Sequence, residues 1–285
     1  MNLCDELTIR ALLERHGFHF SKSMGQNFLI DPEVPARIAA ASQADETCGV
    51  LEIGPGIGPL TAELARRAGK VVSVELDRSL LPVLAETMAE YPNVEIVPGD
   101  VMKLDLNALI AEKFQGLRPI VCANLPYNIT TPVLTKLVET PAIETVTVLI
   151  QKEVAQRLAA PQGSADGGAF SLYLQYYMET GCLFDVPREK FLPSPKVTSA
   201  VLRCVRREKP AVDTADEDFF FKVIRGAFLL RRKTLANSLA AALPGMDKTA
   251  IAAAIAACGL PSAVRGEALT LSDFAALSAA LSAES

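Results

Sequence analysis

The segment Asn124–Leu125–Pro126–Tyr127 brings three chemically useful groups together, directly after an apolar run. An exocyclic amine of a nucleobase is a weak nucleophile, because its lone pair is delocalised into the ring. The side-chain oxygen of Asn124 and the backbone carbonyl of Leu125 could accept its hydrogens and favour a pyramidal nitrogen. Pro126 fixes φ and stiffens the turn, and the face of Tyr127 can stack on a base. The segment therefore predicts a nucleobase clamp, with an ordinary turn and a packing tyrosine as the alternative.

A glycine-rich turn and two acidic residues could bind a nucleoside beside this clamp. Gly54 and Gly56 lie in "VLEIGPGIGPLT", between a predicted strand and a predicted helix. Glycine there allows positive φ and a close approach of backbone N–H groups to a ligand. Glu75 ends the next predicted strand, about 20 residues on, where an acid commonly binds ribose hydroxyls. Asp100 ends a third strand and is predicted to meet the adenine amino group, and Val101, the next residue, is predicted to bind the same cofactor.

The glycine spacing helps to choose between two cofactors. The turn reads GxGxG, and Pro59 stands where the dinucleotide-binding pattern GxGxxG has its third glycine. S-Adenosylmethionine fits better, because it has a ribose, an adenine and a sulfonium cation but no pyrophosphate. A nicotinamide-dependent dehydrogenase is an alternative that shares the turn and Glu75. It would leave Asp100 and the segment 124–127 without roles.

Several motifs resemble those of one enzyme family and occur in the same order. The family is that of the rRNA adenine dimethyltransferases. The later motifs resemble the small-subunit rRNA enzymes rather than the sister family that methylates large-subunit rRNA. The resemblance covers nearly the whole chain, through "GQNFLID" (25–31), "LEIGPGIGPLT" (51–61), "VELD" (74–77), "GDVM" (99–102), "NLPYNITTP" (124–132), "FLPSPKVTSAV" (191–201) and "RRKTLANSL" (231–239).

The resemblance implies an activity and a substrate. Such an enzyme transfers methyl groups from S-adenosylmethionine to N6 of two adjacent adenines near the 3′ end of small-subunit (16S) rRNA, twice per adenine. A base inside a helix cannot be reached, so the target adenine would be unpaired or flipped out. The partner would be the rRNA of an assembling 30S-type subunit.

The resemblance also implies roles for individual residues. The segment from Asn124 to Tyr127 would hold the target adenine. Phe191 would stack on the opposite face of that adenine, unless it is a core phenylalanine at a strand edge. Phe28 would either close the cofactor pocket or only pack. The cofactor contacts would come from Asn27, Leu29, Gly54, Glu75, Asp100 and Asn124.

Short apolar runs that alternate with helical stretches predict an α/β fold for most of the chain. Such a pattern is typical of a mostly parallel sheet with helices on both faces, as in a Rossmann-like methyltransferase domain that uses S-adenosylmethionine. The predicted strands are Val50–Ile53, Val71–Glu75, Val94–Val97, Ile120–Ala123, Thr145–Gln151 and Ser199–Cys204, and predicted helices include Leu60–Ala68 and Ser79–Glu90.

The sequence pattern becomes purely helical towards the C-terminus. Asp216–Leu230 has an apolar stripe at helical spacing. Asp247–Ala257 is rich in alanine and is followed closely by Gly259, a helix stop. Thr270 and Asp273 resemble a capping box that opens a last helix.

These patterns predict two domains. The first is a Rossmann-like methyltransferase domain over residues 1–207, in which residues 1–31 fold over the cofactor site. The second is a small all-helical domain over residues 208–285 that contacts the rRNA.

Composition narrows the classes of protein further. Half of the 285 residues are hydrophobic, yet no run approaches the roughly 20 apolar residues of a membrane span, and the N-terminus lacks a signal-peptide layout. We therefore expect a soluble, cytoplasmic protein, and a monomer. The six cysteines form no CxxC pair and the only histidines are His16 and His19, so neither a disulfide framework nor a metal site is predicted.

The net charge of −5 gives no overall signal for a nucleic-acid partner, but basic residues cluster twice. We expect these clusters to contact rRNA phosphates, which position an RNA without specifying its sequence. A non-catalytic RNA-binding factor of the same fold is a further alternative. A non-catalytic factor would be expected to lack the glycine turn or Asn124, and this sequence has both. The clusters are Arg203, Arg206, Arg207 and Lys209, and Arg225, Arg231, Arg232 and Lys233.

Overall fold

The computed structural model describes residues 1–18 and 25–283, so His19 lies outside the described residues. The chain forms two compact units, each with its own core. Met1–Ala155 and Gly181–Arg206 make up the first unit, and Gln156–Thr180 with the chain from Arg207 onward makes up the second.

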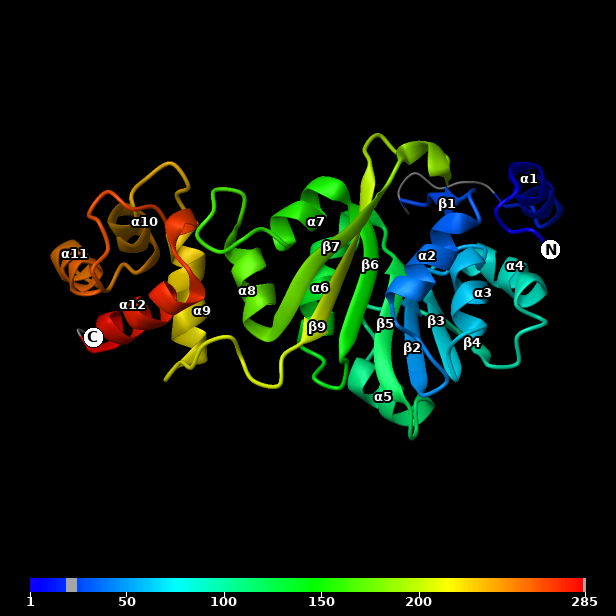
Figure 1. The fold of residues 1–285 in the computed structure, drawn as a ribbon, viewed down its shortest axis with the longest axis horizontal. Coiled ribbons are helices and arrows are strands. Elements are labelled where there is room, and N and C mark those ends of the chain that lie inside the picture. The colour runs from blue at the N-terminus through cyan, green and yellow to red at the C-terminus, as the bar shows by residue number, and fades with distance from the viewer. Residues whose placement is uncertain (19–24, 284–285) are drawn as a thin grey trace. The chain divides into compact units, whose positions relative to one another are not determined.

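A seven-stranded mixed sheet is the main feature of the α/β part of the chain (Figure 1). Its strand order is β4-β3-β2-β5-β6-β9-β7; strands β2 to β6 run parallel to their neighbours, and β9 runs antiparallel to β6. The predicted α/β class is confirmed, and each predicted strand forms with ends that differ by at most two residues. The strands are β1 (Phe28–Leu29), β2 (Cys48–Ile53), β3 (Lys70–Glu75), β4 (Val94–Pro98), β5 (Arg118–Asn124), β6 (Thr145–Gln151), β7 (Met178–Val186), β8 (Phe191–Leu192) and β9 (Ser199–Arg206).

The sequence pattern did not predict strand β7, which lies at the edge of the sheet. Its middle residues Cys182 and Leu183 are exposed and follow Gly181, so it lacks the continuous apolar run that marks an inner parallel strand. The two-residue strands β1 and β8 form a separate antiparallel pair, which is too short to leave a periodic pattern.

The strand order reverses between β2 and β5, which are neighbours in the sheet but not in the chain. The chain runs outward from β2 through β3 to β4, and then starts again at β5 and runs the other way to β6. Ligands of open α/β sheets bind outside the carboxyl ends of the strands at such a reversal. This edge is therefore where the predicted site residues should meet.

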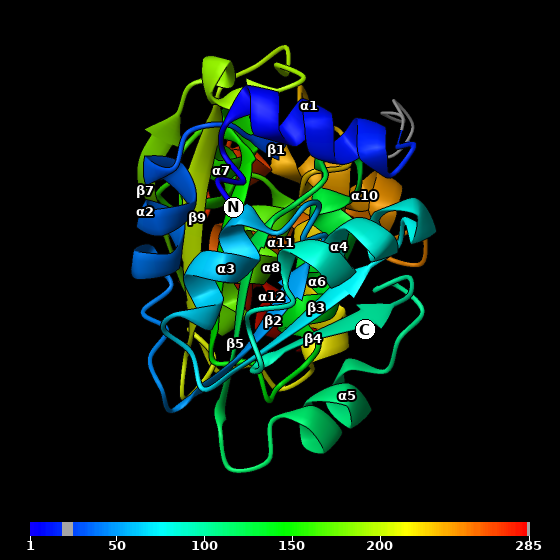
Figure 2. The ribbon, with the colours of Figure 1, turned by 90° about the vertical axis from the view of Figure 1, so that its right-hand side faces the viewer.

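Helices cover both faces of the sheet, with α2 and α3 on one face and α6 on the other (Figures 1 and 2). Alternate residues of the inner strands, such as Val50, Val71 and Ile120, pack with α2 and α3 in one buried cluster. Helix α1 packs against α4 in a second cluster (Figure 2). The helices in this part of the chain are α1 (Glu6–Arg15), α2 (Glu33–Ala41), α3 (Pro59–Ala65), α4 (Leu81–Thr87), α5 (Leu106–Lys113), α6 (Thr130–Val138) and α7 (Lys152–Leu158).

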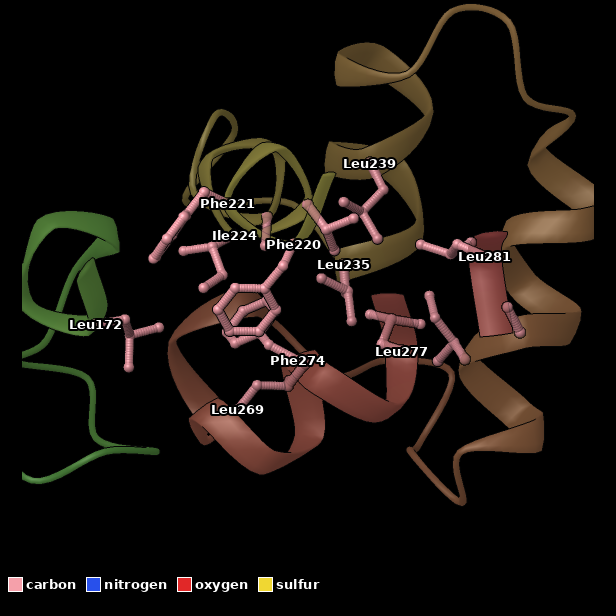
Figure 3. Packing of buried hydrophobic residues seen from close by; sticks show 14 of the residues in the cluster. Leu172, Phe220, Phe221, Ile224, Leu235, Leu239, Leu269, Phe274, Leu277 and Leu281 are labelled. Carbon is pink, nitrogen blue, oxygen red and sulfur yellow. The ribbon is translucent and has the colours of Figure 1, made fainter. Parts of the chain in front are cut away.

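The second unit is built around aromatic and leucine side chains, with Phe220 and Phe274 fully buried at its centre (Figure 3). Leu172 and Tyr176 of α8 join this core, which is why residues 156–180 group with the C-terminal helices, although the sequence-based division at 207/208 assigned them to the α/β domain. Its helices are α8 (Ala169–Tyr177), α9 (Glu217–Ala227), α10 (Leu235–Ala242), α11 (Lys248–Ala257) and α12 (Leu271–Ala283).

The predicted capping box forms at the start of α12. The carboxylate of Asp273 accepts hydrogen bonds from the backbone N–H of Thr270 at 2.8 Å and from its hydroxyl at 2.7 Å, and the backbone N–H of Asp273 donates to that hydroxyl at 3.2 Å.

No helix in the described part of the chain is both long and apolar enough to cross a bilayer.

One carboxyl group is buried beneath the glycine turn. Glu52 of β2 is 1% exposed, and its Oε2 accepts hydrogen bonds from Thr61 Oγ1 on α3 and from Ser73 Oγ on β3, both at 2.7 Å. Burial raises the pKa of Glu52 to about 7, although the two hydroxyl donors act to lower it. The side chain thus ties together the strand before the turn, the helix after it and the next strand.

Glu52→Gln is expected to remove a pH dependence of stability. The glutamate pKa is about 4.3 in an unfolded chain and about 7 in the folded protein. The folded state therefore holds the proton more tightly, and stability falls as the pH rises between these values, by about 4 kcal/mol in all. Glutamine keeps an oxygen acceptor for both hydroxyls and carries no charge. Urea unfolding between about pH 5 and pH 8 should show wild type losing stability relative to the variant, and parallel curves would contradict this account.

Candidate active site

A cavity of about 210 Å³ opens at the edge of the sheet where the strand order reverses. Four chain segments that leave neighbouring strands line it, and a fifth segment comes from the N-terminal part of the chain. Eleven residues predicted for the cofactor and base sites line this cavity, namely Asn27, Leu29, Gly54, Gly56, Glu75, Asp100, Val101, Asn124, Leu125, Pro126 and Tyr127.

The glycine turn needs its glycines for two reasons. Gly54 and Gly56 have φ of +68° and +62°, a region that residues with a Cβ rarely adopt. A Cβ at Gly56 would also lie 3.1 Å from the ring of Phe28. Phe28 both lines the cavity and is 5% exposed, so it packs on the turn and also forms part of the cavity wall.

The two strand-end acids differ in their surroundings. Glu75 is 5% exposed; its Oε1 accepts from the backbone N–H of Asp77 at 2.7 Å and its Oε2 from that of Gly56 at 3.4 Å. Burial raises the pKa of Glu75, against the lowering effect of these donors. The Oδ1 of Asp100 accepts from the backbone N–H of Met102 at 2.9 Å.

In the described residues, no cluster of His, Cys, Asp and Glu could hold a metal ion.

Sequence reasoning missed an apolar residue that follows Glu75 directly. Leu76 lines the cavity and is 53% exposed. A leucine side chain of that exposure contributes little to the hydrophobic core. It offers a flat base an apolar contact next to the acid that is predicted to bind the ribose. The sequence signal that could have identified Leu76 is a large apolar residue immediately after a strand-end acid.

The carboxamide of Asn124 has a defined orientation. Its Nδ2 donates to the backbone carbonyl of Asn27 at 3.2 Å, so Oδ1 is the end that can accept from a ligand. Leu125 is 1% exposed, and its backbone N–H donates to the carbonyl of Leu149 on β6 at 3.1 Å. The turn is therefore tied to the sheet at Leu125 and to the N-terminal segment at Asn124.

A serine that sequence reasoning missed holds the aromatic ring of the clamp. The hydroxyl of Tyr127 lies 2.6 Å from Ser199 Oγ at the start of β9, and Ser199 is fully buried. Burial raises the pKa of Tyr127, with an opposing effect of the serine. Ser199 lies 72 residues further along the chain, so no local pattern could have indicated this contact.

Phe191 lies apart from the other predicted site residues. It is 2% exposed and packs in the core cluster that contains Leu29 and Val201, and it is not one of the residues that line the cavity. Its backbone pairs with that of Leu29 between β1 and β8. This placement favours the core alternative, and the stacking role stays a prediction.

Residues 25–29 form a strap along the cavity, since all five line it. Beyond the strap, the backbone N–H of Ile30 donates to the carbonyl of Lys190 at 2.9 Å, and Asp31 forms an ion pair with Lys190. This strap belongs to the segment 1–31 that the sequence predicts to fold over the cofactor site.

Comparison with known proteins agrees with this geometry. The family model described as "Ribosomal RNA adenine dimethylase" matches residues 17–260. Proteins named "Ribosomal RNA small subunit methyltransferase A" are similar along almost their whole length. The one from Anoxybacillus flavithermus is 47% identical over 273 residues, which is 94% of this chain and 92% of that protein. The one from Geobacillus kaustophilus is 48% identical over 276 residues, which is 95% of this chain and 94% of that protein.

The chain belongs to the ribosomal RNA adenine dimethylase family.

Two solved structures share the fold. A 23S rRNA methyltransferase, ErmE, matches with a TM-score of 0.70 and 28% identity, over 90% of this chain and all of that chain. A dimethyladenosine transferase from Plasmodium falciparum matches with a TM-score of 0.73 and 23% identity, over 87% of this chain and 95% of that chain. The family model and the similar relatives confirm the resemblance found in the sequence motifs.

Two arginines of the first basic cluster, Arg206 and Arg207, form hydrogen bonds within the protein. The guanidinium of Arg206 donates to the backbone carbonyls of Leu137, Val138, Thr140 and Ile143 at 2.7–3.3 Å. These bonds give additional donors to carbonyl groups at and beyond the end of α6, where the last carbonyls of a helix have no partner within the helix. Arg207 donates to the carbonyl of Gln175 and to the carboxylate of Glu179. Nε and Nη2 of Arg206 are thus bonded within the protein, and the contact of this cluster with phosphates stays a prediction.

The second basic cluster lies on the second unit and is exposed. Arg225, Arg231, Arg232 and Lys233 form no ion pair with any described residue. Leu229 and Leu230, beside them, are 57% and 39% exposed. The side chains that could contact a phosphate backbone in this unit are thus concentrated at the end of α9 and just after it.

Tyr127→Phe and Ser199→Ala are each expected to lower the free energy of unfolding by about 1–2 kcal/mol, because the first leaves the buried hydroxyl of Ser199 and the second the half-buried hydroxyl of Tyr127 without its partner. The double variant removes both hydroxyls and should cost less than the sum of the two. Urea unfolding of the four proteins forms the double-mutant cycle that measures this coupling.

Ser272→Ala is the matched control, since Ser272 is an exposed serine of the second unit. Combined with Tyr127→Phe, it should give additive effects. If the Tyr127 and Ser199 variants are also additive, the two hydroxyls do not interact.

Proposed function

We propose that this protein transfers methyl groups from S-adenosylmethionine to N6 of two adjacent adenines near the 3′ end of small-subunit (16S) rRNA, twice per adenine. Its substrate would be an assembling 30S-type subunit, and it would act as a monomer in the cytoplasm. The observation that carries the proposal is the orientation of Asn124, whose Oδ1 can accept from an amine at the cavity.

Sequence identity supports the small-subunit rRNA as substrate. Relatives named for the small subunit share 47–48% of residues with this chain, whereas the 23S rRNA enzyme shares 28%. Membership of an adenine dimethylase family also disfavours the dehydrogenase alternative. The glycine turn and Asn124 are both present, which argues against a non-catalytic factor.

The residues that line the cavity fit S-adenosylmethionine. Gly54 and Gly56 leave the turn without side chains, so a ligand can approach its backbone closely. The Glu75 carboxylate can accept from both ribose hydroxyls, and Asp100 with Val101 would meet the adenine. When bound, the donor supplies a methyl group on a sulfonium cation, which is electrophilic without further activation.

Asn124 and Leu125 would act on the target amine. Asn124 Oδ1 and the carbonyl of Leu125 accept its two hydrogens, so the lone pair is withdrawn from the ring and directed at the methyl carbon. As the new N–C bond forms, the S–C bond breaks, and the amine then releases a proton to water. Positioning supplies most of the rate enhancement in such a displacement, so no strong general base is required.

Tyr127 would hold the base flat while this happens. Its hydroxyl is bonded to Ser199, so the outer end of the ring is held in place, and stacking on an aromatic ring contributes about 1–3 kcal/mol per base. A paired adenine cannot reach this position, so the target would be unpaired or flipped out. The exposed cations after α9 would contact phosphates and fix the register of the RNA.

Asn124→Ala is expected to lower methyl transfer about 100-fold, the usual cost of losing one preorganised polar group that acts on the reacting atoms. Transfer of labelled methyl from S-adenosylmethionine to immature small subunits measures this. Asn107→Ala, an exposed asparagine of α5, is the control and should label as wild type does.

Two outcomes would count against the proposal. Absence of label with wild-type protein would overturn the enzymatic function itself. Equal labelling by Asn124→Ala and wild type would overturn the role of the carboxamide as an amine acceptor.

Glu75→Ala is expected to weaken binding of S-adenosylmethionine at least about tenfold, because hydrogen bonds to a charged acceptor contribute about 1.5–3 kcal/mol. Isothermal titration calorimetry with S-adenosylmethionine and with NAD measures this. Wild type should bind only the former, and Glu90→Ala, an exposed glutamate, should bind as wild type does. An unchanged affinity in Glu75→Ala would remove the ribose contact from the account.

A further inference from the structure

The strap (residues 25–29) is tied to the sheet by the side chain of Gln26. Gln26 Nε2 donates to Asp77 Oδ2 at 2.7 Å, across 51 residues of the chain. The other oxygen, Asp77 Oδ1, accepts from the backbone N–H of Ser79 at 2.9 Å and from its hydroxyl at 2.6 Å. Asp77 is thus held in place by the turn that follows β3, and it gives Gln26 a fixed attachment point.

The next residue of the strap contacts the clamp itself. The backbone carbonyl of Asn27 accepts the hydrogen bond from Asn124 Nδ2. The side-chain Nδ2 of Asn27 donates to the carbonyl of Gly25 at 3.0 Å, which closes a tight turn around Gln26. Gly25 adopts φ of +63°, and a Cβ there would lie 3.4 Å from Asn128 Oδ1. The direction of the Asn27 carbonyl therefore depends on how this turn is held.

The other end of the strap is held by β8. Phe28 pairs with Leu192 and Leu29 with Phe191. With β8 holding one end and Asp77 the other, the carbonyl of Asn27 lies between two anchored points.

We propose that Gln26 is a positioning residue for methyl transfer, which acts through Asp77 and the strap to keep the Asn27 carbonyl on Asn124 Nδ2. This inference rests on the proposed function. Its consequence is that the Asn124 carboxamide, which could otherwise rotate and present its NH₂ group to the target amine, is held with Oδ1 towards it.

The charge of Asp77 supports the strength of this link. Burial acts to raise the pKa of Asp77, but hydrogen bonds from Ser79 and Gln26 outweigh it and keep the pKa below its usual value. Asp77 is therefore a carboxylate at neutral pH, and hydrogen bonds to an ionised acceptor are stronger than neutral ones.

A charge exchange across the pair tests the inference. Gln26→Glu sets two carboxylates against each other and should lower kcat about tenfold or more. Gln26→Glu combined with Asp77→Asn restores an amide–carboxylate bond in the opposite direction, and kcat should return to within about threefold of wild type. Asparagine at 77 keeps an oxygen for Ser79, so the turn after β3 is retained.

The assay is labelled methyl transfer to immature small subunits at saturating S-adenosylmethionine, with cofactor affinity measured separately by calorimetry. Gln26→Glu should lower kcat by a larger factor than it weakens cofactor binding. Gln115→Glu, at an exposed glutamine, is the matched control for the added charge and should leave kcat unchanged.

The outcomes are distinct. If wild type transfers methyl and Gln26→Glu does so equally well, the inference fails while the proposed function stands. A single variant as slow as expected, with no recovery in the double variant, also overturns it, because a general loss of structure would not be reversed by exchanging the partners. If wild type transfers no methyl, the proposed function fails and the inference fails with it.

Discussion

The reversal of strand order between β2 and β5 is the constraint on which the candidate site depends. Parallel strands present their carboxyl ends at one edge, and at the reversal the crossover helices leave to opposite faces, so that edge stays open. Each strand end then contributes what its last residues carry. The glycine turn follows β2, Glu75 ends β3, Asp100 follows β4 and Asn124 ends β5. A cofactor site and a base clamp thereby become neighbours, although their residues are spread over 70 positions of the chain.

Polar groups at this edge are held by hydrogen bonds to other residues of the chain. Glu52 holds the glycine turn from beneath through two hydroxyls, and Ser199 fixes the ring of Tyr127. The strap orients the carboxamide of Asn124. Such preorganisation matters for a weak nucleophile, since groups already in place need not reorganise as the reaction proceeds. Without these hydrogen bonds, the same side chains could bind a base but would not direct its amine at the methyl carbon.

Charge is used differently in the two units. Arg206 serves the first unit by bonding the carbonyls near the end of α6, whereas the cations after α9 in the second unit are exposed. A protein with net charge −5 therefore still offers a concentrated positive surface. Local concentration of cations, rather than total charge, determines contact with a phosphate backbone.

The sequence by itself determined the fold class, the inner strands and eleven of the residues that line the cavity. Those features have local signals: apolar runs for buried strands, glycines at a turn, and acids and the Asn–Leu–Pro–Tyr segment at strand ends. Edge strand β7 and the pairing of β1 with β8 lacked such signals. Only the tertiary structure showed that residues 156–180 share the core of the C-terminal helices, that Arg206 is internally bonded and that Phe191 lies in the core. It alone joined Ser199 to Tyr127 and Gln26 to Asp77. These contacts link residues 51 and 72 positions apart, and which side chains meet across such separations depends on how the elements pack, which no local pattern encodes.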